Sequence, residues 1–263
     1  MYDKKAGPLP GFFYARNSEY AVLMIVLCTD FGPGPYTGQM QAVLQQRAPD
    51  VPVVSLFDDL PCWDIRAAAY LLPAYVNEFP LDTVFLVVVD PGVGSDSREP
   101  VIARIDGRWF VGPGNGVFHV LAPRARSSRF WRIDWRPEQL SSSFHGRDLF
   151  APIAARLACG QTPDGTEIIE PPVEGEWPED MARILYFDHF GNAISGMRAE
   201  CLHSDQKIEV SGHIISSART FSDVPEGEVF WYANSNGLVE ISVNCGRAED
   251  LDGIELQAVI KML

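Results

Sequence analysis

Short apolar runs without regular polar alternation recur along the first part of the chain, at residues 21–27, 51–57 and 84–89. They are rich in β-branched and long aliphatic residues, which is typical of strands buried on both faces of a mainly parallel sheet. Segments with helical spacing, residues 39–47 and 65–77, lie between these runs. Strands that alternate with helices imply βαβ units with right-handed crossovers. The pattern therefore predicts an α/β domain.

Two of the predicted strands end on a carboxylate, Asp30 after the first run and Asp90 after the third. Glycine and proline residues follow both carboxylates, so each strand is expected to give way to a turn. Ligands of open α/β sheets bind outside the carboxyl ends of the strands, which makes both residues candidates for a site. Aspartate also favours turns through its own side-chain hydrogen bonds, so a purely structural role for Asp90 is equally open at this point.

Two short sequence signals indicate where a helix begins and where two strands form a hairpin. Asp64 stands just before the second helical segment and suits an N-cap, because its carboxylate can accept from the open amides of the first turn. The dipeptide Asp106-Gly107 separates residues 102–105 from residues 109–111 and predicts a hairpin.

The chain changes character at residues 161–180, which are rich in proline, glycine and acidic residues and contain no lysine or arginine. Such a composition is typical of a surface linker. Short predicted strands separated by glycine, asparagine and serine turns follow, and this spacing predicts a small all-β domain. We therefore expect an N-terminal extension at residues 1–20, an α/β domain at 21–165, a linker at 166–182 and an all-β domain at 183–263.

Composition narrows the classes of function. The net charge of -14 argues against a surface for nucleic acid or an anionic membrane. The five cysteines are scattered without CxxC spacing, which fits reduced intracellular thiols better than disulfides or a zinc site. No apolar run approaches the ~20 residues of a membrane helix, and the first twenty residues lack the apolar centre of a signal peptide. We expect a cytoplasmic protein without a membrane or nucleic-acid partner.

Several familiar catalytic motifs are incomplete. Gly32, Gly34 and Gly38 are spaced one residue too far apart for a dinucleotide fingerprint, and the prolines among them remove amides that would face a pyrophosphate. The tripeptide Asp30-Phe31-Gly32 matches the metal-binding tripeptide of kinases, but no His-Arg-Asp loop precedes it. No Gly-x-Ser-x-Gly elbow occurs. These observations argue against an NAD enzyme, a kinase and a serine hydrolase.

His145 is the most informative histidine, because a glycine and then the charged residues Arg147 and Asp148 follow it. A carboxylate, a guanidinium and an imidazole together can hold a water, orient it and stabilise its partial deprotonation. Asp90, Arg98 and His145 could form such a group. The residues alone leave open whether these three meet or whether His145 is structural.

Six motifs taken together carry a family resemblance: TDFG at 29–32, PCWD at 61–64, VDPGVG at 89–94, GPGNG at 112–116, FHGRD at 144–148 and FGN at 190–192. In this order and spacing the chain resembles the S-adenosyl-L-methionine (SAM) hydroxide adenosyltransferases, relatives of the fluorinating and chlorinating adenosyltransferases. The resemblance runs from about residue 22 to the C-terminus.

The resemblance implies an N-terminal α/β domain, a C-terminal β-barrel-like domain and a homotrimer with active sites between neighbouring subunits. It also implies hydrolysis of SAM by attack of water at the ribose C5′, giving adenosine and L-methionine without a metal or another cofactor. This chemistry is physically reasonable, because a sulfonium is already a good leaving group. The enzyme must mainly desolvate and aim a water in line.

The resemblance also implies roles for individual residues. Asp90, Arg98 and His145 match the water-activating positions, and Asp30 matches the carboxylate that binds the ribose hydroxyls. Further matches fall on the cleft walls and the ends of the substrate: Trp63, Phe144 and Gly146 in the cleft, Asp188, Asn192 and Ser235 at the methionine amino acid end, Phe190 stacked on adenine, and Asn244 and Cys245 at the adenine edge.

Two departures from the family pattern affect these expectations. The arginine of the hydrolases usually comes seven residues after the aspartate, where this chain has Ser97, and Arg98 follows. A shift of the loop could restore its reach, or Arg147 could substitute. Asn236, which we also count among the substrate-binding residues, stands where the halogenases carry an arginine, and this difference would weaken binding of the substrate carboxylate.

Two alternative functions remain at this stage. The halogenases of the same fold carry tyrosine at the positions of Asp90 and His145, and a charged Asp90 would repel a halide in a desolvated site. Hydroxide transfer is therefore favoured over halogenation. The other alternative is a non-catalytic protein that binds SAM or adenosine, and the presence of both Asp90 and His145 argues against it.

Overall fold

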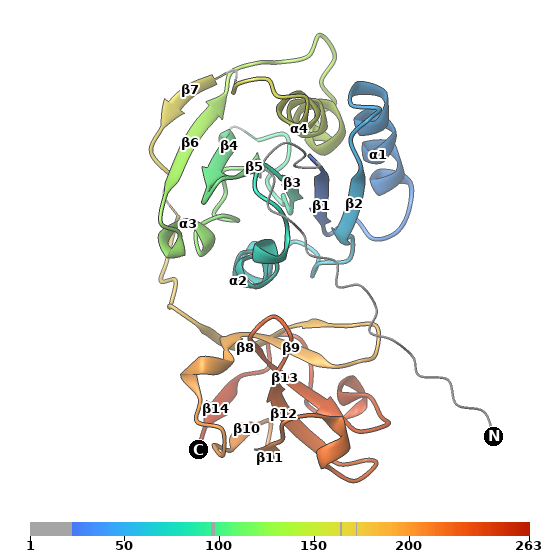
Figure 1. The fold of residues 1–263 in the computed structure, drawn as a ribbon, viewed down its shortest axis with the longest axis vertical. Coiled ribbons are helices and arrows are strands. Elements are labelled where there is room, and N and C mark those ends of the chain that lie inside the picture. Colours follow the sequence, from blue (N-terminus) through green and yellow to red (C-terminus); the bar gives the residue numbers. More distant parts are fainter. Residues whose placement is uncertain (1–22, 96–97, 164, 172) are drawn as a thin grey trace, which may run out of the picture.

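The computed structural model describes residues 23–95, 98–163, 165–171 and 173–263 (Figure 1). The predicted N-terminal extension at 1–20 and Ser97 lie outside the described residues. Within the described part, the N-terminal domain contains a seven-stranded sheet of order β2-β1-β3-β5-β4-β6-β7. Its strands are β1 (Ile25–Thr29), β2 (Val53–Phe57), β3 (Val84–Val88), β4 (Pro100–Ile105), β5 (Arg108–Pro113), β6 (Ser128–Ile133) and β7 (Gly165–Ile168).

The sheet is mixed, whereas the apolar runs predicted a mainly parallel one. The pairs β1–β2, β1–β3 and β3–β5 are parallel, and the pairs β4–β5, β4–β6 and β6–β7 are antiparallel. The cause is the hairpin predicted at Asp106-Gly107, which is confirmed and returns the chain directly without a crossover helix. The α/β class itself is confirmed.

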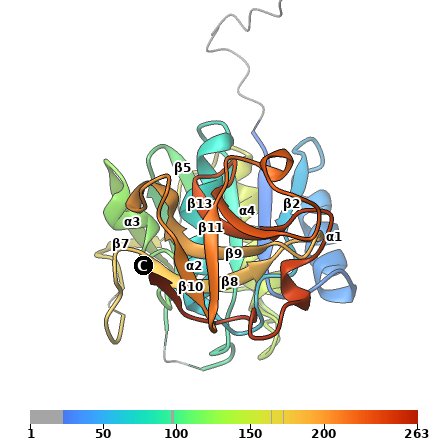
Figure 2. The ribbon, with the colours of Figure 1, turned by 90° about the horizontal axis from the view of Figure 1, so that it is seen from below.

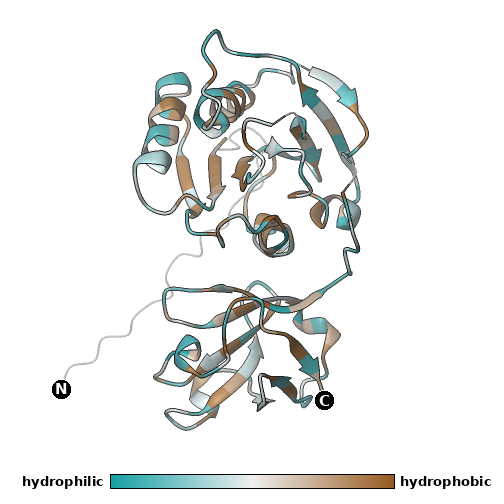
Figure 3. Ribbon diagram, turned by 180° about the vertical axis from the view of Figure 1, so that it is seen from behind, coloured by the Kyte–Doolittle hydropathy of each residue, from teal (hydrophilic) through white to brown (hydrophobic). Residues whose placement is uncertain are grey.

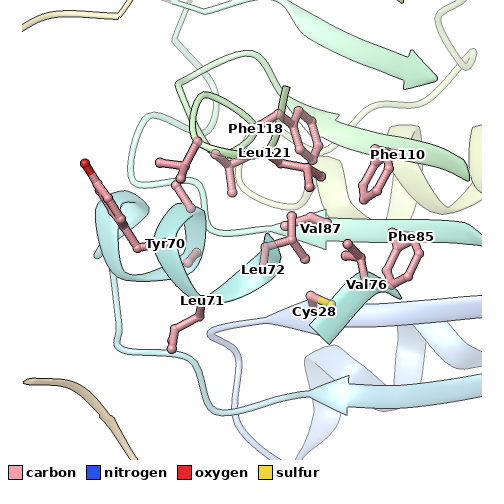
Figure 4. Close-up of a cluster of buried hydrophobic side chains, with 14 of the residues drawn as sticks. Cys28, Tyr70, Leu71, Leu72, Val76, Phe85, Val87, Phe110, Phe118 and Leu121 are labelled. Carbon is pink, nitrogen blue, oxygen red and sulfur yellow. The ribbon is translucent and has the colours of Figure 1, made fainter. Parts of the chain in front are cut away.

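Helices cover both faces of this sheet. The helices α1 (Pro35–Arg47) and α4 (Ala151–Ala158) pack on one face, where Ile25, Leu27 and Val84 are fully buried. The helix α2 (Ile65–Tyr75) packs on the other face, in a buried cluster that includes Val26; Figure 4 draws side chains of this cluster from both the helix and the strands. Because both faces are covered, the central strands β1 and β3 are buried at every position and have no polar alternation, and the middle of the sheet is hydrophobic (Figure 3).

The helix boundaries follow from capping and from the 3-10 and π turns at their ends. Asp64 caps α2 as predicted, because its side chain accepts from the backbone N of Ala67 at 2.9 Å. The remaining helical elements are short: η1 (Val76–Glu78), α3 (Leu121–Arg124), η2 (Gly146–Phe150), η3 (Ala199–Cys201), η4 (Phe221–Asp223) and η5 (Ala248–Asp250). The π turn η2 leads directly into α4, so the segment that carries His145 is continuous with a buried helix.

The C-terminal domain is an almost closed β-barrel, as the family resemblance implied (Figure 2). Its strands are β8 (Met181–Phe187), β9 (Ala193–Arg198), β10 (Ile208–Val210), β11 (His213–Ser217), β12 (Val229–Ala233), β13 (Leu238–Val243) and β14 (Ile260–Met262), in the order β14-β10-β11-β12-β13-β9-β8. A bridge between Arg183 and Val259 brings β8 back towards β14. The two edges of the sheet therefore approach each other.

The segment between the domains is fixed to α2. The rings of Trp177 and Tyr70 stack with centroids 6.1 Å apart, and the Arg66 guanidinium lies 4.9 Å from the Trp177 ring centre. The Tyr70 hydroxyl donates to the carbonyl of Pro178 and Arg66 donates to that of Glu176. The predicted linker at 166–182 contains most of β7 and the start of β8, and its boundaries stay a prediction.

Candidate functional site

Asp90 and Arg98 form a buried ion pair just beyond the carboxyl end of β3. Arg98 Nε donates to Asp90 Oδ1 at 3.0 Å, and Arg98 Nη2 donates to Oδ2. Only 5% of the Asp90 side chain and 6% of the Arg98 side chain are exposed. Such a two-point contact fixes the orientation of both groups, because the guanidinium and the carboxylate are planar. Arg98 therefore reaches Asp90 although it stands one residue later than the family pattern places it.

His145 lies against the same arginine. Its Nδ1 is 3.3 Å from Arg98 Nη2, and a guanidinium can only donate, so Nδ1 is the acceptor. The neutral ring consequently carries its proton on Nε2. Burial, together with the charge of Arg98, holds the pKa of His145 below its ordinary value of 6.5. The structure thus brings together the three residues singled out from the sequence, with the imidazole in its neutral form.

Arg147, the alternative partner, is engaged elsewhere. Its Nε donates to Asp148 Oδ1 at 2.6 Å, its Nη2 donates to Asp148 Oδ2 at 3.0 Å, and its Nη1 donates to Gln39 Oε1 at 2.8 Å. Its guanidinium also covers the Phe144 ring at 5.0 Å from the centroid. Of the two arginines that the sequence left open, Arg98 is the one that contacts Asp90 and His145.

Asp30 lies beyond the neighbouring strand β1 and holds the loop that carries Trp63. Its Oδ2 accepts from the backbone N of Trp63 at 2.8 Å. Trp63 has φ of 62°, a left-handed conformation that is rare for a large side chain. Its ring is exposed, with 76% of the residue accessible. Burial raises the pKa of Asp30, and the negative charge of Asp90 raises it further, so the two carboxylates share one electrostatic environment.

Three aromatic rings form one wall beside these carboxylates. The ring of Phe144 meets Tyr36 edge-on at 5.3 Å and Phe31 edge-on at 5.9 Å. Of these three rings, the sequence analysis identified only Phe144. Phe31 lies inside the TDFG motif and Tyr36 follows it closely, so their position near this motif could have indicated that they belong to the site. Gly146 packs beneath this wall, where an added Cβ would lie 3.1 Å from Met40 Sδ. The same Cβ would lie 3.4 Å from the Phe144 ring and 3.5 Å from the Phe31 ring, so a larger side chain has little free space there.

A second group of predicted residues lies in the C-terminal domain, on the turn between β8 and β9. Asp188 Oδ1 accepts from the backbone N of Phe190 and of Asn192, both at 2.9 Å. Asp188 Oδ2 accepts from Asn192 Nδ2 at 2.9 Å. Gly191, with φ of 79°, allows the tight turn. The Phe190 ring projects outward, with 71% of the residue exposed.

This second group lines a cavity of about 970 Å³. The predicted residues among its walls are Asp188, Phe190, Asn192, Ser235, Asn236 and Cys245. Asn244 is not among the described residues of the walls, and its Nδ2 donates to the carbonyl of Val224 at 2.8 Å. The sequence did not identify several other polar wall residues, among them Tyr75, Tyr186, Tyr232 and Glu240, which come from four separate elements and share no motif.

The predicted residues thus fall into two groups in a single chain. Among the described residues that line the cavity, Asp30, Asp90, Arg98 and His145 do not occur. A separate cavity of about 1060 Å³ between the domains includes Asn236 but no other predicted residue. The described residues contain no cluster of three or more metal-ligating side chains, and no helix among them is long and apolar enough to span a membrane.

Comparisons with known proteins cover both domains. Residues 25–167 match the family model described as SAM hydroxide adenosyltransferase N-terminal domain, and residues 182–261 match that of the C-terminal domain. A protein of Thermus thermophilus named (R)-S-adenosyl-L-methionine hydrolase is 37% identical over 91% of this chain and 99% of its own length. A Salinispora tropica protein of the same name is 36% identical over 88% of this chain and 94% of its own length.

Solved structures agree with this likeness. An uncharacterized conserved protein from Thermotoga maritima has a TM-score of 0.82 at 29% identity, over 91% of this chain and 99% of its own. A conserved hypothetical protein from Thermus thermophilus has a TM-score of 0.71 at 36% identity, over 92% of this chain and 100% of its own.

Proposed function

This chain belongs to the SAM hydroxide adenosyltransferase family, and from that premise we propose that it hydrolyses S-adenosyl-L-methionine to adenosine and L-methionine. A water oxygen bonds to the ribose C5′ while the C5′–S bond breaks. The bonding electron pair goes to sulfur, which becomes a neutral thioether, and one proton of the water is released. The observation that carries the proposal is the contact of Asp90, Arg98 and His145 at the carboxyl edge of the sheet.

In this proposal Asp90 accepts a hydrogen of the attacking water. Arg98 uses one acceptor direction on each carboxylate oxygen, and each oxygen keeps another. The Nε2–H of His145 donates to one lone pair of the water, so the other lone pair is aimed at C5′. Arg98 is the positioning residue, because it touches both groups. The buried setting strengthens these interactions and reduces the reorganisation that attack requires.

The other predicted residues would hold the rest of the substrate. Asp30 would bind the ribose hydroxyls beside the aromatic wall, and the cavity around Asp188 would take the methionine and adenine ends. Because Asp30, Asp90, Arg98 and His145 are absent from the described walls of this cavity, we infer a homotrimer in which one subunit supplies the first group and its neighbour the second. The separation of the groups supports this assembly, as does the exposure of Trp63 and Phe190.

The test of the reaction is to incubate the purified protein with SAM in ¹⁸O-water and to analyse the adenosine by mass spectrometry. We expect ¹⁸O at the 5′ oxygen, because water is the nucleophile. Parallel reactions with chloride and fluoride should give no 5′-halide, since the buried negative charge of Asp90 disfavours a halide beside it. Tight binding of SAM with no product in any reaction would contradict hydrolysis and favour the non-catalytic alternative.

The pH dependence of hydrolysis should follow the neutral form of His145. Burial and Arg98 lower the pKa of this histidine, so the neutral ring persists below pH 6.5 and is lost only as the pH falls through the lowered value. We therefore expect the acidic limb that His145 contributes to kcat/KM to lie below pH 6.5. The pH profile of kcat/KM measures the acidic limb, and an NMR titration of the His145 ring measures the pKa of that residue. A His145 midpoint at or above pH 6.5 would contradict this assignment.

A further inference from the structure

Glu240 is a buried carboxylate in the wall of the cavity around Asp188. It lies in the middle of β13, and only 4% of the residue is exposed. Its Oε1 accepts from the Tyr232 hydroxyl at 2.6 Å and from the Ser242 hydroxyl at 3.4 Å. Its Oε2 accepts from Asn234 Nδ2 at 3.0 Å. An ionised carboxylate offers about four acceptor directions, so one remains for a further donor.

Glu240 has no cationic partner among the described residues, since no lysine, arginine or histidine there forms an ion pair with it. A buried carboxylate without a positive partner is costly, even when neutral donors satisfy part of its hydrogen bonding. The one arginine among the described wall residues, Arg247, is already paired with Glu249 and donates to the carbonyl of His189. Among the described residues, Glu240 therefore has only neutral hydrogen-bond partners, Tyr232, Asn234 and Ser242.

Asp188 adds a second carboxylate to the same walls. It accepts three hydrogen bonds, from two backbone amides and from Asn192, which leaves one acceptor direction on Asp188 as well. Both negative charges act on the same phenol: burial raises the pKa of Tyr75 to about 12, and Glu240 and Asp188 contribute to the shift. Tyrosine and phenylalanine rings complete the walls. The cavity is thus an aromatic enclosure with a negative interior, which suits a cation.

We propose that Glu240 is a specificity-determining residue that selects the α-ammonium group of the substrate. The inference rests on the proposed function, because it takes SAM as the ligand of this cavity. Apart from Arg247, which is paired with Glu249, the donors that the walls offer the substrate carboxylate are neutral, such as Ser235 and Asn236. The ammonium group therefore contributes more to recognition than the carboxylate does. A ligand that keeps the ammonium but lacks the carboxylate should still bind and react.

Glu240 also orients the turn that carries these neutral donors. Asn234 donates its Nδ2 to Glu240, which leaves its Oδ1 to accept from the backbone N of Asn236 and of Leu238, each at 3.0 Å. Removal of the negative charge could disturb this turn as well as the recognition of the cation. The test must therefore separate the loss of charge from a change of shape.

Three ligands separate these contributions: SAM, decarboxylated SAM with an aminopropyl group, and 5′-dimethylsulfonio-5′-deoxyadenosine, which keeps the sulfonium but has no ammonium. Binding is measured by calorimetry in an Asp90→Asn background, so that little ligand is consumed during the titration. Glu240→Gln should weaken binding of the two ammonium ligands by about 10- to 100-fold, the range expected for a charged hydrogen bond. Binding of the dimethylsulfonium compound should not change.

Two matched variants complete the design. Ser242→Ala removes one neutral hydrogen bond to Glu240 and keeps the charge, so the preference for ammonium ligands should persist. Glu240→Asp also keeps the charge and should retain most of this preference. Thermal unfolding of Glu240→Gln is measured in parallel to show that the variant is folded during the titration, because glutamine has only one acceptor oxygen for the donors Tyr232, Ser242 and Asn234.

Equal weakening of all three ligands by Glu240→Gln, or no weakening of any, would overturn the proposal. So would loss of the ammonium preference in Ser242→Ala or Glu240→Asp. The failure of the proposed function is a different result: the wild-type protein would bind SAM with ammonium selection but release no adenosine. If hydrolysis holds, decarboxylated SAM should yield adenosine and 3-(methylthio)propylamine by the same bond changes at C5′.

Discussion

Replacement of Asp90 with asparagine should lower the rate of adenosine formation by about 10²- to 10⁴-fold, the range over which positioned acid–base groups act. The side chain is almost fully buried and bound at two points by Arg98, so asparagine keeps its shape and one acceptor oxygen. What it loses is the negative charge that receives the proton of the water. The substrate binds through other groups, so the dissociation constant of SAM should change little.

The measurement combines a chromatographic assay of adenosine with calorimetric titration of SAM. The thermal unfolding of the variant must also be measured, because asparagine leaves the buried charge of Arg98 without its counter-ion. Breaking a buried ion pair lowers the free energy of unfolding by about 3–5 kcal/mol. A folded variant that binds SAM but turns it over at less than a hundredth of the wild-type rate supports the role of Asp90. A rate within tenfold of the wild type would mean that Asp90 serves the turn and the ion pair alone.

The second large effect should distinguish Arg98 from Arg147. Arg98→Met should lower turnover by about 10²-fold, because Asp90 and His145 both lose the group that orients them. It should also raise the pKa of His145, since the charge of Arg98 helps to hold that value down while Asp90 acts in the opposite direction. The acidic limb of the rate profile should therefore move to higher pH.

Arg147→Met is the matched control. Arg147 binds Asp148 and Gln39 near the surface, and such partly exposed ion pairs contribute about 0–1 kcal/mol. Turnover and the His145 titration should stay close to those of the wild type. If Arg147→Met were the more damaging of the two, or if Arg98→Met left the pKa of His145 unchanged, the assignment of Arg98 would be wrong.

Much of the fold could be predicted because its causes are local. The apolar runs before Asp30 and Asp90 reflect burial on both faces, and Asp64 and Asp106-Gly107 act through their own neighbours. The mixed character of the sheet could not be derived in this way. The predicted hairpin makes β4 antiparallel to β5, but it does not specify that β5 pairs parallel with β3 or that β6 and β7 extend the sheet as antiparallel strands.

In the candidate site, too, local motifs predict some residues, whereas others come together only through the tertiary structure. Asp90 and His145 stand out from their own motifs, but the reach of Arg98 depends on the path of its loop, which a one-residue shift made ambiguous. Glu240 and Tyr75 were not identified, because their proximity arises only when β13 and the end of α2 meet at one cavity. An alternating strand gives Glu240 no signature that separates it from an exposed residue.

The hydrogen bond from the backbone of Trp63 to Asp30 makes these two residues thermodynamically coupled. The carboxylate proposed to bind the ribose also stabilises the left-handed conformation that presents the indole ring. A change at Asp30 therefore acts twice, and the effects of substitutions at the two positions should not add. The loss measured at Asp30 is the loss of a ribose ligand and of a fixed aromatic surface together.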